Sequence, residues 1–558
     1  MNKIFKMVAA GVVVVAIATS LIVGRHLLIG ENASGGNRVN IAFYGWGNES
    51  EVALTHQFVD EFNKTQDRIF VKYTSIPNSD YGIKINNALY SQTPPDILIA
   101  GDGEIKPWIE LNGLAPLDDF LEKSTEIDID DFWEEGQNRY YYNPQTRLNG
   151  NYKDPSYKSK GYHHYGIMRD LSPTVLFYNK TAFEKVGVTV ISMSPEKQLE
   201  EYGYARGYNP ETKVFNNLIP MTYEEMLVLA ALNNRNPSAS SEYRNDHATT
   251  TYGIHYVNWF SLGWSVNANS LQWLRDDSYA LGGYYKYTLN DTQTNYSVKE
   301  GKTITIAEGT CRETTYTEGQ LVQYDNLIDV RSLGEDVIDE YFYRLPSALQ
   351  ATQDYVDLSA KYKVGPKPDF TNSSSVSQYS IFTSGNQTAM IADSRYAVGI
   401  YRNLIKNNFE WDCAPLPTYE HGVQSGHSGS LAFCITQKSK HKKEAFEFLE
   451  YINGKTGQTA FAEAGFTIPN TKSLSNSNVF LQKKKAPANS KLFVEAAAYQ
   501  TVGDWGFLPS KDWITPWSTL LNSKVLNGDM DLKLALDQTQ GETQKRIDEY
   551  YQFINVRV

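Results

Sequence analysis

The sequence predicts an α/β fold in which apolar strands alternate with amphipathic helices. Three short apolar strands are expected near its beginning, at about 39–44, 69–73 and 97–99. Between them, apolar residues recur every three or four positions, as on one face of a helix. Such alternation is typical of a parallel sheet covered by helices. With 558 residues, 41% of them hydrophobic, the chain is long enough for two lobes and insertions.

The loops that follow the first and third strands are the first candidate positions for a binding site. A helix is expected from about residue 51, with Asn48 or Ser50 as its N-cap. In sheets of this kind, ligands lie beyond the carboxyl ends of the strands. We therefore expect the loops 45–50 and 100–104 to share one rim of the sheet.

Later parts of the chain alternate between irregular and helical segments. Residues 139–164 are rich in Tyr, Asn, Gly and Lys and predict a long loop, whereas 287–319 predicts a β-hairpin insertion. Amphipathic periodicity returns further on. It predicts helices over about 220–232, 439–452, 457–464 and 532–553.

The N-terminus has the pattern of an export signal. Lys3 and Lys6 precede an uncharged apolar run over 7–23. At about 1.5 Å per residue this run would reach roughly 25 Å as a helix, just short of the hydrocarbon thickness of a membrane. Cleavage as a signal peptide and retention as a membrane anchor both stay open, with retention favoured. We assign 1–30 to the signal or anchor and 31–38 to a small, polar linker.

The three cysteines give no sign of a metal site or of lipid attachment. Cys311, Cys413 and Cys434 lie far apart without a CxxC pair, so a structural zinc site is not expected. We interpret Cys434 as a buried strand residue and the other two as free thiols, with one disulfide in an oxidising compartment as the alternative. None lies near the N-terminal apolar run, which argues against a lipoprotein.

Charge and aromatic content narrow the class of partner. The net charge of −12 and the lack of a basic stripe argue against nucleic acid. The chain contains 38 Tyr, 24 Phe and 10 Trp. Aromatic faces suit flat, partly apolar ligands such as pyranose rings, although most aromatic residues in any protein only pack in the core.

Motifs for catalysis are weak. The nearest match to GxSxG, residues 426–430, lacks the final Gly, and HExxH and Walker patterns are absent from the sequence. We therefore predict that the protein is not an enzyme and needs no cofactor or metal. Two alternatives stay open: a secreted glycoside hydrolase, which needs only two suitably spaced carboxylates, and a surface carbohydrate-binding adhesin.

Several blocks, in order along the chain, resemble the family 1 extracellular solute-binding proteins. This group contains the maltose- and oligosaccharide-binding components of ABC importers. The blocks are YGWGNESE (44–51), ALYSQTPPDILI (88–99), ELNGLAPLDDFL (110–121), YGIMRDLSPTVLFYNKTAFEKVGV (165–188), PMTYEEM (220–226), FTSGNQTAMIADSRY (382–396), FEWDCAPLP (409–417), KSKHKKEAFEFLEYI (438–452) and AEAGFTIPN (462–470).

The resemblance implies a two-lobed, type II periplasmic-binding-protein-like fold. Each lobe would be a mixed, mostly parallel sheet flanked by helices, hinged by crossing segments expected at 174–178, 389–395 and 431–435. Lobe 1 would then hold 39–174 plus 393–431. Lobe 2 would hold 177–390 plus 434–558.

The resemblance also implies a function and its partners. The protein would capture a carbohydrate, most simply an oligosaccharide, in the cleft between the lobes and deliver it to the permease subunits of an ABC transporter. It would act as a monomer on the extracytoplasmic face of the cell membrane, attached through the N-terminal segment or secreted after its cleavage. The identity, length and charge of the sugar stay open.

Candidate ligand contacts in the first lobe follow the strand ends. Trp46 stands between two glycines that let the backbone approach closely, and Asn48 and Glu49 beside it could bind hydroxyls. Asp102 and Glu104 occupy a position that the family uses for polar contacts, although the family often has an aromatic residue just before them. For Trp46 the alternative is a structural role at the sheet edge.

Further candidates come from the crossings and the second lobe. Asp170 lies at the first crossing, and Arg395 and Tyr396 lie at the second. Arg395 would be the partner of an acidic sugar, or else would form an ion pair across the hinge. Aromatic stacking is expected from Trp259, Trp517 and, second, Trp513, with packing in the core as the alternative for each. The segment 428–430 could offer N–H groups and hydroxyls.

Overall fold

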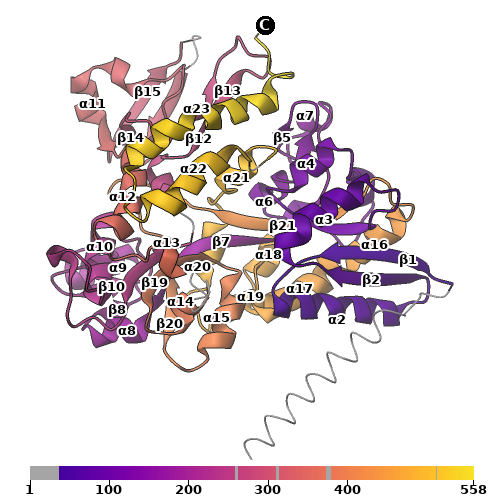
Figure 1. Ribbon diagram of the computed structural model, residues 1–558, viewed down its shortest axis with the longest axis horizontal. Helices are drawn as coiled ribbons and strands as arrows, with labels where there is room; N and C mark the ends of the chain where they lie inside the picture. Colours follow the sequence, from indigo (N-terminus) through magenta and orange to yellow (C-terminus); the bar gives the residue numbers. More distant parts are fainter. Residues whose placement is uncertain (1–36, 258–261, 310–312, 372–378, 511, 558) are drawn as a thin grey trace, which may run out of the picture.

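The structure is a computed structural model that describes residues 37–257, 262–309, 313–371, 379–510 and 512–557. The described part forms two lobes joined through one mixed sheet, in the strand order β11-β19-β7-β21-β3-β1-β2, with β20 and β22 also paired to β7 (Figure 1). The strands of this sheet are β1 (Val39–Gly45), β2 (Ile69–Ser75), β3 (Ile97–Gly101), β7 (Ile167–Asn179), β11 (Tyr252–Tyr256), β19 (Thr388–Ser394), β20 (Trp411–Ala414), β21 (Ser428–Ile435) and β22 (Ile468–Pro469).

The expected N-terminal strands and helices are confirmed. Strands β1, β2 and β3 are parallel neighbours, and helix α2 (Glu49–Thr65) connects the first two. Asn48 is the N-cap of α2, because its side chain accepts hydrogen bonds from two backbone N–H groups of the first turn. Glu51 completes a capping box by accepting from the N–H of Asn48.

Helices and small sheets surround this framework. The remaining α-helices of the first part are α3 (Asn78–Tyr90), α4 (Ile105–Glu110), α5 (Asp118–Leu121), α6 (Glu134–Asn138), α7 (Pro155–Lys158), α8 (Lys180–Lys185), α9 (Pro195–Tyr202) and α10 (Tyr223–Asn233). Those of the later part are α11 (Glu335–Tyr341), α12 (Ala348–Ala360), α13 (Pro368–Thr371), α14 (Ser380–Thr383), α15 (Ala397–Ile405), α16 (Lys442–Asn453), α17 (Lys455–Ala464), α18 (Lys472–Ser475), α19 (Asn478–Leu481), α20 (Lys491–Ala496), α21 (Asp504–Phe507), α22 (Thr515–Leu520) and α23 (Leu532–Tyr551).

The short strands form five small sheets beside the main one. They comprise β4 (Tyr141–Asn143), β5 (Leu148–Asn149), β6 (His163–His164), β8 (Thr189–Ile191), β9 (Tyr208–Asn209), β10 (Val214–Asn216), β12 (Leu271–Arg275), β13 (Gly283–Tyr287), β14 (Asn295–Val298), β15 (Thr303–Ala307), β16 (Glu313–Thr317), β17 (Leu321–Val322) and β18 (Phe342–Leu345). The predicted insertion at 287–319 is confirmed in part as the β15–β16 hairpin.

Strand β7 belongs to both lobes. Its first half pairs with β21, up to Pro173 opposite Ser428, and its second half pairs with β19, from Thr174 opposite Ser394. Pro173 has no N–H to place in a ladder, so it suits the point where one partner strand gives way to the next. Figure 1 shows β7 running from one lobe into the other.

The second half of β7 is buried on both faces. Val175 and Phe177 face the core around β1 and α16, whereas Leu176 and Tyr178 face a separate core around α8 and α10. Successive side chains of a strand point to opposite faces, so a continuous apolar run is what two covered faces require. All 13 residues of β7 are buried.

Strand pairing corrects parts of the predicted lobe composition. Helix α16 packs on β1 and α2, which places 442–453 in the first lobe rather than the second. Strand β20 pairs with the second half of β7 and so lies in the second lobe, not the first. The pairing is also less parallel than expected, since every neighbour of β7 is antiparallel.

The predicted third crossing is also wrong. The segment 431–435 lies within β21, which pairs with β3 and with the first half of β7, so it remains in the first lobe. The chain returns from the second lobe earlier, in the loop between β20 and β21.

The C-terminal helices build a further core beside the second lobe. Helices α22 and α23 pack together on the β12–β13 hairpin around Leu271, Leu289, Trp513 and Trp517. The predicted signal or anchor at 1–30 lies outside the described residues. Among those that are described, no helix is both long and apolar enough to cross a bilayer.

Asp393, in β19, makes stability depend on pH. Burial raises the pKa of its carboxyl from 3.8 to about 6, although hydrogen bonds from Tyr401 and the Ser394 N–H oppose this. The folded protein then binds a proton that the unfolded chain has lost, so stability falls as pH rises through this window. Relative to Asp393→Asn, the wild type should lose on the order of 3 kcal/mol between pH 4 and 7. Urea unfolding of both proteins at pH 4 and pH 7 measures this loss. The prediction is contradicted if the difference in unfolding free energy between wild type and variant is the same at both pH values.

Candidate ligand-binding site

A cavity of about 460 Å³ lies where β7 passes from one lobe to the other. We call it the hinge cavity. Its wall comes from the loops after β1 and β3, from β7 and β21, and from Tyr379 and Tyr396 beside β19. Six of the predicted site residues line it: Trp46, Asn48, Asp102, Glu104, Asp170 and Tyr396.

The loops after β1 and β3 meet at one rim, as predicted. Both strands run in the same direction, so their carboxyl ends fall at the same edge of the sheet. Side chains pack closely on the two glycines there, since a Cβ on Gly101 would stand 2.3 Å from Glu104 Oε2 and one on Gly45 2.8 Å from Ile99 Cδ1. Glycine at these two positions brings Trp46 and Glu104 close to the sheet end.

Trp46 supplies the aromatic surface of the hinge cavity. It is half-buried and makes a T-shaped contact with Tyr81, with 6.4 Å between ring centroids. Tyr81 is held in turn by a 2.7 Å hydrogen bond from its hydroxyl to the carbonyl of Ile99. The indole is therefore fixed in place while part of it faces the cavity, which is the arrangement that stacking on a sugar ring requires.

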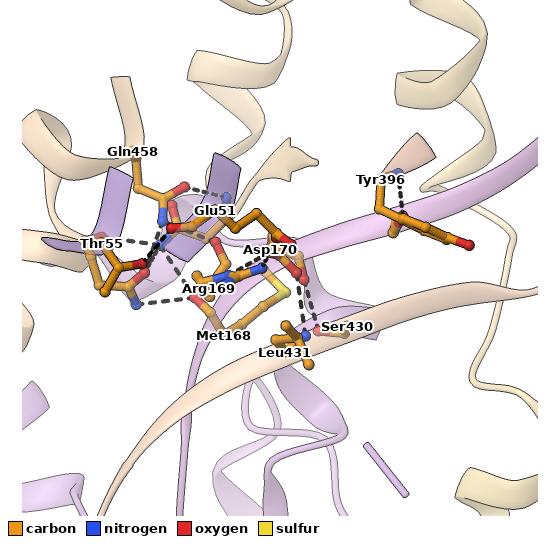
Figure 2. A network of polar contacts seen from close by, with 12 residues as sticks. Glu51, Thr55, Met168, Arg169, Asp170, Tyr396, Ser430, Leu431 and Gln458 are labelled. Atoms are coloured by element: carbon orange, nitrogen blue, oxygen red, sulfur yellow. Dashed lines mark hydrogen bonds and ion pairs between the residues drawn. The ribbon is translucent and has the colours of Figure 1, made fainter. Parts of the chain in front are cut away.

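A buried network around Arg169 forms the floor of the cavity (Figure 2). Arg169 donates from Nε to Asp170 Oδ2 at 2.6 Å and from Nη2 to Glu51 Oε1 at 3.1 Å. Burial by itself would lower the pKa of Arg169, but the carboxylates of Asp170 and Glu51 outweigh it, and the pKa is raised. The arginine is thus a permanent cation that fixes two carboxylates.

The same network connects the start of α2, the first half of β7 and strand β21 within the first lobe. Glu51 Oε2 accepts from the N–H and the side-chain amide of Asn48, at 3.0 and 2.8 Å. Asp170 Oδ1 accepts from the N–H of Leu431, and its carbonyl accepts from the hydroxyl of Ser430 at 2.7 Å. Asn48 is therefore positioned by Glu51, and Asp170 by Arg169, Ser430 and Leu431. Figure 2 shows the contacts of Asp170.

His427, on the segment that leads into β21, gives the cavity a neutral imidazole. Burial lowers its pKa to about 3, with a smaller effect from the nearby Arg139. A neutral ring has one donor and one acceptor nitrogen, so it can bond to a hydroxyl in either sense. The protonation state of His427 should therefore not change between pH 5 and 8.

Asp102 lies between the hinge cavity and a second cavity of about 280 Å³ and lines both. It is 7% exposed and accepts a hydrogen bond from Arg139 Nη1 at 3.0 Å. Nη1 also contacts the carbonyl of Ser428. The ion pair joins the loop after β3 to helix α6 and to the start of β21.

Four predicted contacts that the structure describes do not line the hinge cavity: Glu49, Arg395, Trp513 and Trp517. Glu49 is exposed in the first turn of α2, because the capping box turns Glu51 inward instead. Arg395 is fully buried between Phe480 and Phe493 and donates to the carbonyl of Phe466. Trp259 lies outside the described residues.

Trp513 and Trp517 are core residues, which corrects the prediction that they stack on a sugar. Both are 0% exposed and pack with Leu521, Val525 and Leu536 between helices α22 and α23. The sequence pattern could not separate these roles, because a Trp near the start of an amphipathic helix suits a core as well as a cleft.

Other cavity residues were missed by sequence reasoning, although some carried a signal. Glu51 stands three positions after Asn48, the spacing of a capping box, and Arg169 directly precedes the predicted Asp170. Tyr379, His427 and Thr467 gave no local signal. Within the described parts of the chain, no cluster of His, Cys, Asp and Glu is arranged to hold a metal.

A polar cavity with one fixed tryptophan, at the hinge of two lobes, defines a protein that captures a small ligand. The model of the family "Bacterial extracellular solute-binding protein" matches residues 57–488. The chain therefore belongs to this family, whose members act outside the cytoplasm. Among curated proteins, none matches the sequence.

Solved structures share the fold at low sequence identity. An ABC substrate-binding protein of Listeria monocytogenes, in complex with cycloalternan, is 15% identical with a TM-score of 0.58, covering 91% of this chain and 99% of that one. The GacH receptor of Streptomyces glaucescens is 16% identical with a TM-score of 0.59, and the match covers 92% of this chain and 99% of that one. The sugar-binding protein MalE of Xanthomonas citri is 15% identical with a TM-score of 0.58, and the match covers 92% of this chain and 99% of that one. The type II periplasmic-binding-protein-like fold is confirmed.

Replacing Trp517 tests its placement in the core. Trp517→Ala should lower the free energy of unfolding by about 3–5 kcal/mol, because it leaves a cavity between α22 and α23. Trp46→Ala, at a half-buried position, should cost much less. Urea unfolding measures both. Trp517 would have to be reassigned to a ligand site if its loss left stability unchanged.

Proposed function

We propose that this protein captures a carbohydrate in the hinge cavity and delivers it to the permease subunits of an ABC transporter. The observation that carries this is the fixed Trp46 beside carboxylates, an amide and hydroxyls in one cavity at the hinge. Sugars are bound by such polar groups at their hydroxyl edges and by aromatic faces against their rings. The similar structures include proteins solved with cycloalternan and with maltotriose, in line with an oligosaccharide ligand.

The proposed contacts are Trp46, Asn48, Asp102, Glu104 and Tyr396. Trp46 stacks on a ring, and the polar side chains bind hydroxyls. Asp170 and Glu51 act mainly through Arg169, which occupies one oxygen of each. They are positioning residues for the loops around them.

Lobe closure is the proposed mechanism. We divide the chain where β7 changes partner: the first lobe comprises about 39–172 and 428–484, and the second about 174–427 and 485–557, as strand pairing supports. One core continues across this junction and includes Phe177, Tyr401 and Phe493. A sugar bound on the first lobe meets Tyr379 and Tyr396 from the second, so its binding shifts an equilibrium between open and closed forms. The closed form is then recognised by the permease.

The cellular setting follows the same proposal. The chain acts as a monomer and stays at the membrane through its N-terminal apolar segment, since Leu27–Ile29 extend that segment beyond Arg25. It does not act as a hydrolase. Asp102 and Asp170 each pair with an arginine, which suits them to accept hydrogen bonds and not to donate a proton to a leaving group.

Thermal-shift measurements against a panel of mono- and oligosaccharides test this function. A ligand that binds only the folded state raises the melting temperature. For each sugar that does so, Trp46→Ala should weaken binding about tenfold or more by calorimetry, a loss of about 1.4 kcal/mol.

The matched control is Tyr90→Ala, which removes an aromatic side chain that is 68% exposed and lies outside the cavity. It should leave affinity unchanged. No shift with any sugar, or equal affinity in the Trp46 variant, would refute the proposal. Appearance of a cleaved product on prolonged incubation would favour the hydrolase alternative.

A further inference from the structure

The second cavity, next to the hinge cavity, is lined by more cationic side chains than carboxylates. We call it the Arg139 cavity. Lys106, Arg139 and Arg147 line it together with Asp102 and Glu135. Its far wall is formed by Tyr285, Val502, Gly506 and Phe507, so it lies between the first lobe and the C-terminal part of the chain.

Arg139 lines this cavity, and one edge of its guanidinium has no hydrogen-bond partner in the described structure. Only 5% of the residue is exposed, and its Nη1 is engaged with Asp102 and with the carbonyl of Ser428. Nε and Nη2 are buried and have no hydrogen-bond partner among the described residues. These two N–H groups share one edge of the planar guanidinium and point in parallel, the geometry that matches the two oxygens of a carboxylate.

Two buried donors without acceptors are costly, since each forgoes its hydrogen bonds to water. A ligand with paired acceptor oxygens removes that cost. Arg395 also has Nε and Nη2 without partners, but it lies between two phenylalanine rings and lines neither cavity. Arg139, and not Arg395, is therefore the candidate partner for the acidic group of a sugar.

The other charges favour an anion. Lys106 is buried and holds the carbonyls of Gly506 and Phe507 at 2.8 and 3.0 Å, which keeps its ammonium group at the wall. Burial raises the pKa of Glu135, although Arg139 opposes this shift, and Glu135 is one of only two carboxylates beside the three cations that line the cavity in the described structure. Arg147 is shared with Glu110, which lies outside the cavity.

We propose that the Arg139 cavity receives the carboxylate of an acidic saccharide, a uronic acid unit, whose neighbouring unit lies in the hinge cavity against Trp46. This rests on the proposed function and specifies its ligand. Asp102, which lines both cavities, separates the two units and accepts a hydroxyl between them. A neutral sugar hydroxyl offers the two N–H groups a single uncharged oxygen, whereas a carboxylate offers each of them its own charged oxygen at matching spacing.

Matched pairs of disaccharides test the proposal by calorimetry. Digalacturonate is compared with 4-linked galactobiose, and cellobiouronate with cellobiose. At least one acid should bind the wild type tenfold or more tightly than its neutral counterpart. Arg139→Lys keeps the charge but loses the parallel edge, and should weaken that acid about 10- to 100-fold, at least about tenfold more than it weakens the neutral counterpart.

Two further variants keep the test informative. Glu135→Gln removes the remaining negative charge beside Arg139 and should strengthen acid binding about two- to threefold, even if the Arg139 variant does not fold. Arg68→Lys, at an exposed arginine paired with Glu447, is the control and should change nothing.

Three outcomes would overturn the inference. The first is that the wild type binds both members of every pair with equal affinity. The second is that folded Arg139→Lys keeps the wild-type preference for the acid. The third is that sulfate ion alone binds as tightly as the best acid. If neutral sugars bind and acids do not, only this inference fails. If no saccharide binds at all, the proposed function fails with it.

Discussion

The sharing of strand β7 between two partners is the constraint on which the architecture depends. Pro173 has no N–H to donate, and beside it the neighbours of β7 change from β21 to β19, although the N–H of Thr174 still donates to the carbonyl of His427 at 3.0 Å. Gln500 stabilises the junction, because its side-chain amide accepts a hydrogen bond from the N–H of Thr174 and donates one to the carbonyl of Thr174. The N–H of Arg395 donates to the carbonyl of Pro173 at 2.9 Å, and this brings the second lobe's chain to the same place.

The binding cavity follows from this junction. Strands β1 and β3 end at the same edge at which β7 changes partner, so Trp46, Asp102 and Asp170 converge although they are far apart in the sequence. The Arg169 network then holds these loops with ion pairs that are buried and fully engaged on the protein side. Breaking such a pair by removing one partner leaves an uncompensated charge, so these ion pairs stabilise the arrangement of the segments that they join on the first lobe.

The two cavities that share Asp102 differ in the groups that they offer to a ligand. The hinge cavity joins an aromatic ring to hydrogen-bond acceptors, whereas the Arg139 cavity offers donors and cations. A ligand that reached both would need hydroxyls at one end and paired anionic oxygens at the other. Because the carboxylate of Asp102 lines both cavities, a ligand that contacts both must extend past it and carry its negative charge on the side of the Arg139 cavity.

Local patterns in the sequence were sufficient for the elements and for the rim of the first lobe. Hydrophobic periodicity located β1 to β3, Asn48 was correctly expected as an N-cap, and Gly465 ends α17 in a left-handed conformation. The positions of Trp46 and Asp102 after strand ends followed from the direction of parallel strands. These features depend on neighbours close in the chain, which the sequence displays directly.

What the sequence by itself determined is therefore the α/β class, the strand-end candidates and the family. Only the tertiary structure decided that Trp513 and Trp517 are core, that Arg395 is enclosed by phenylalanines, and that Arg139 faces a cavity. The physical reason is that a Trp or Arg has the same local pattern whether it covers a core or lines a cleft. Its role is set by partners hundreds of residues away, which only the folded chain brings together.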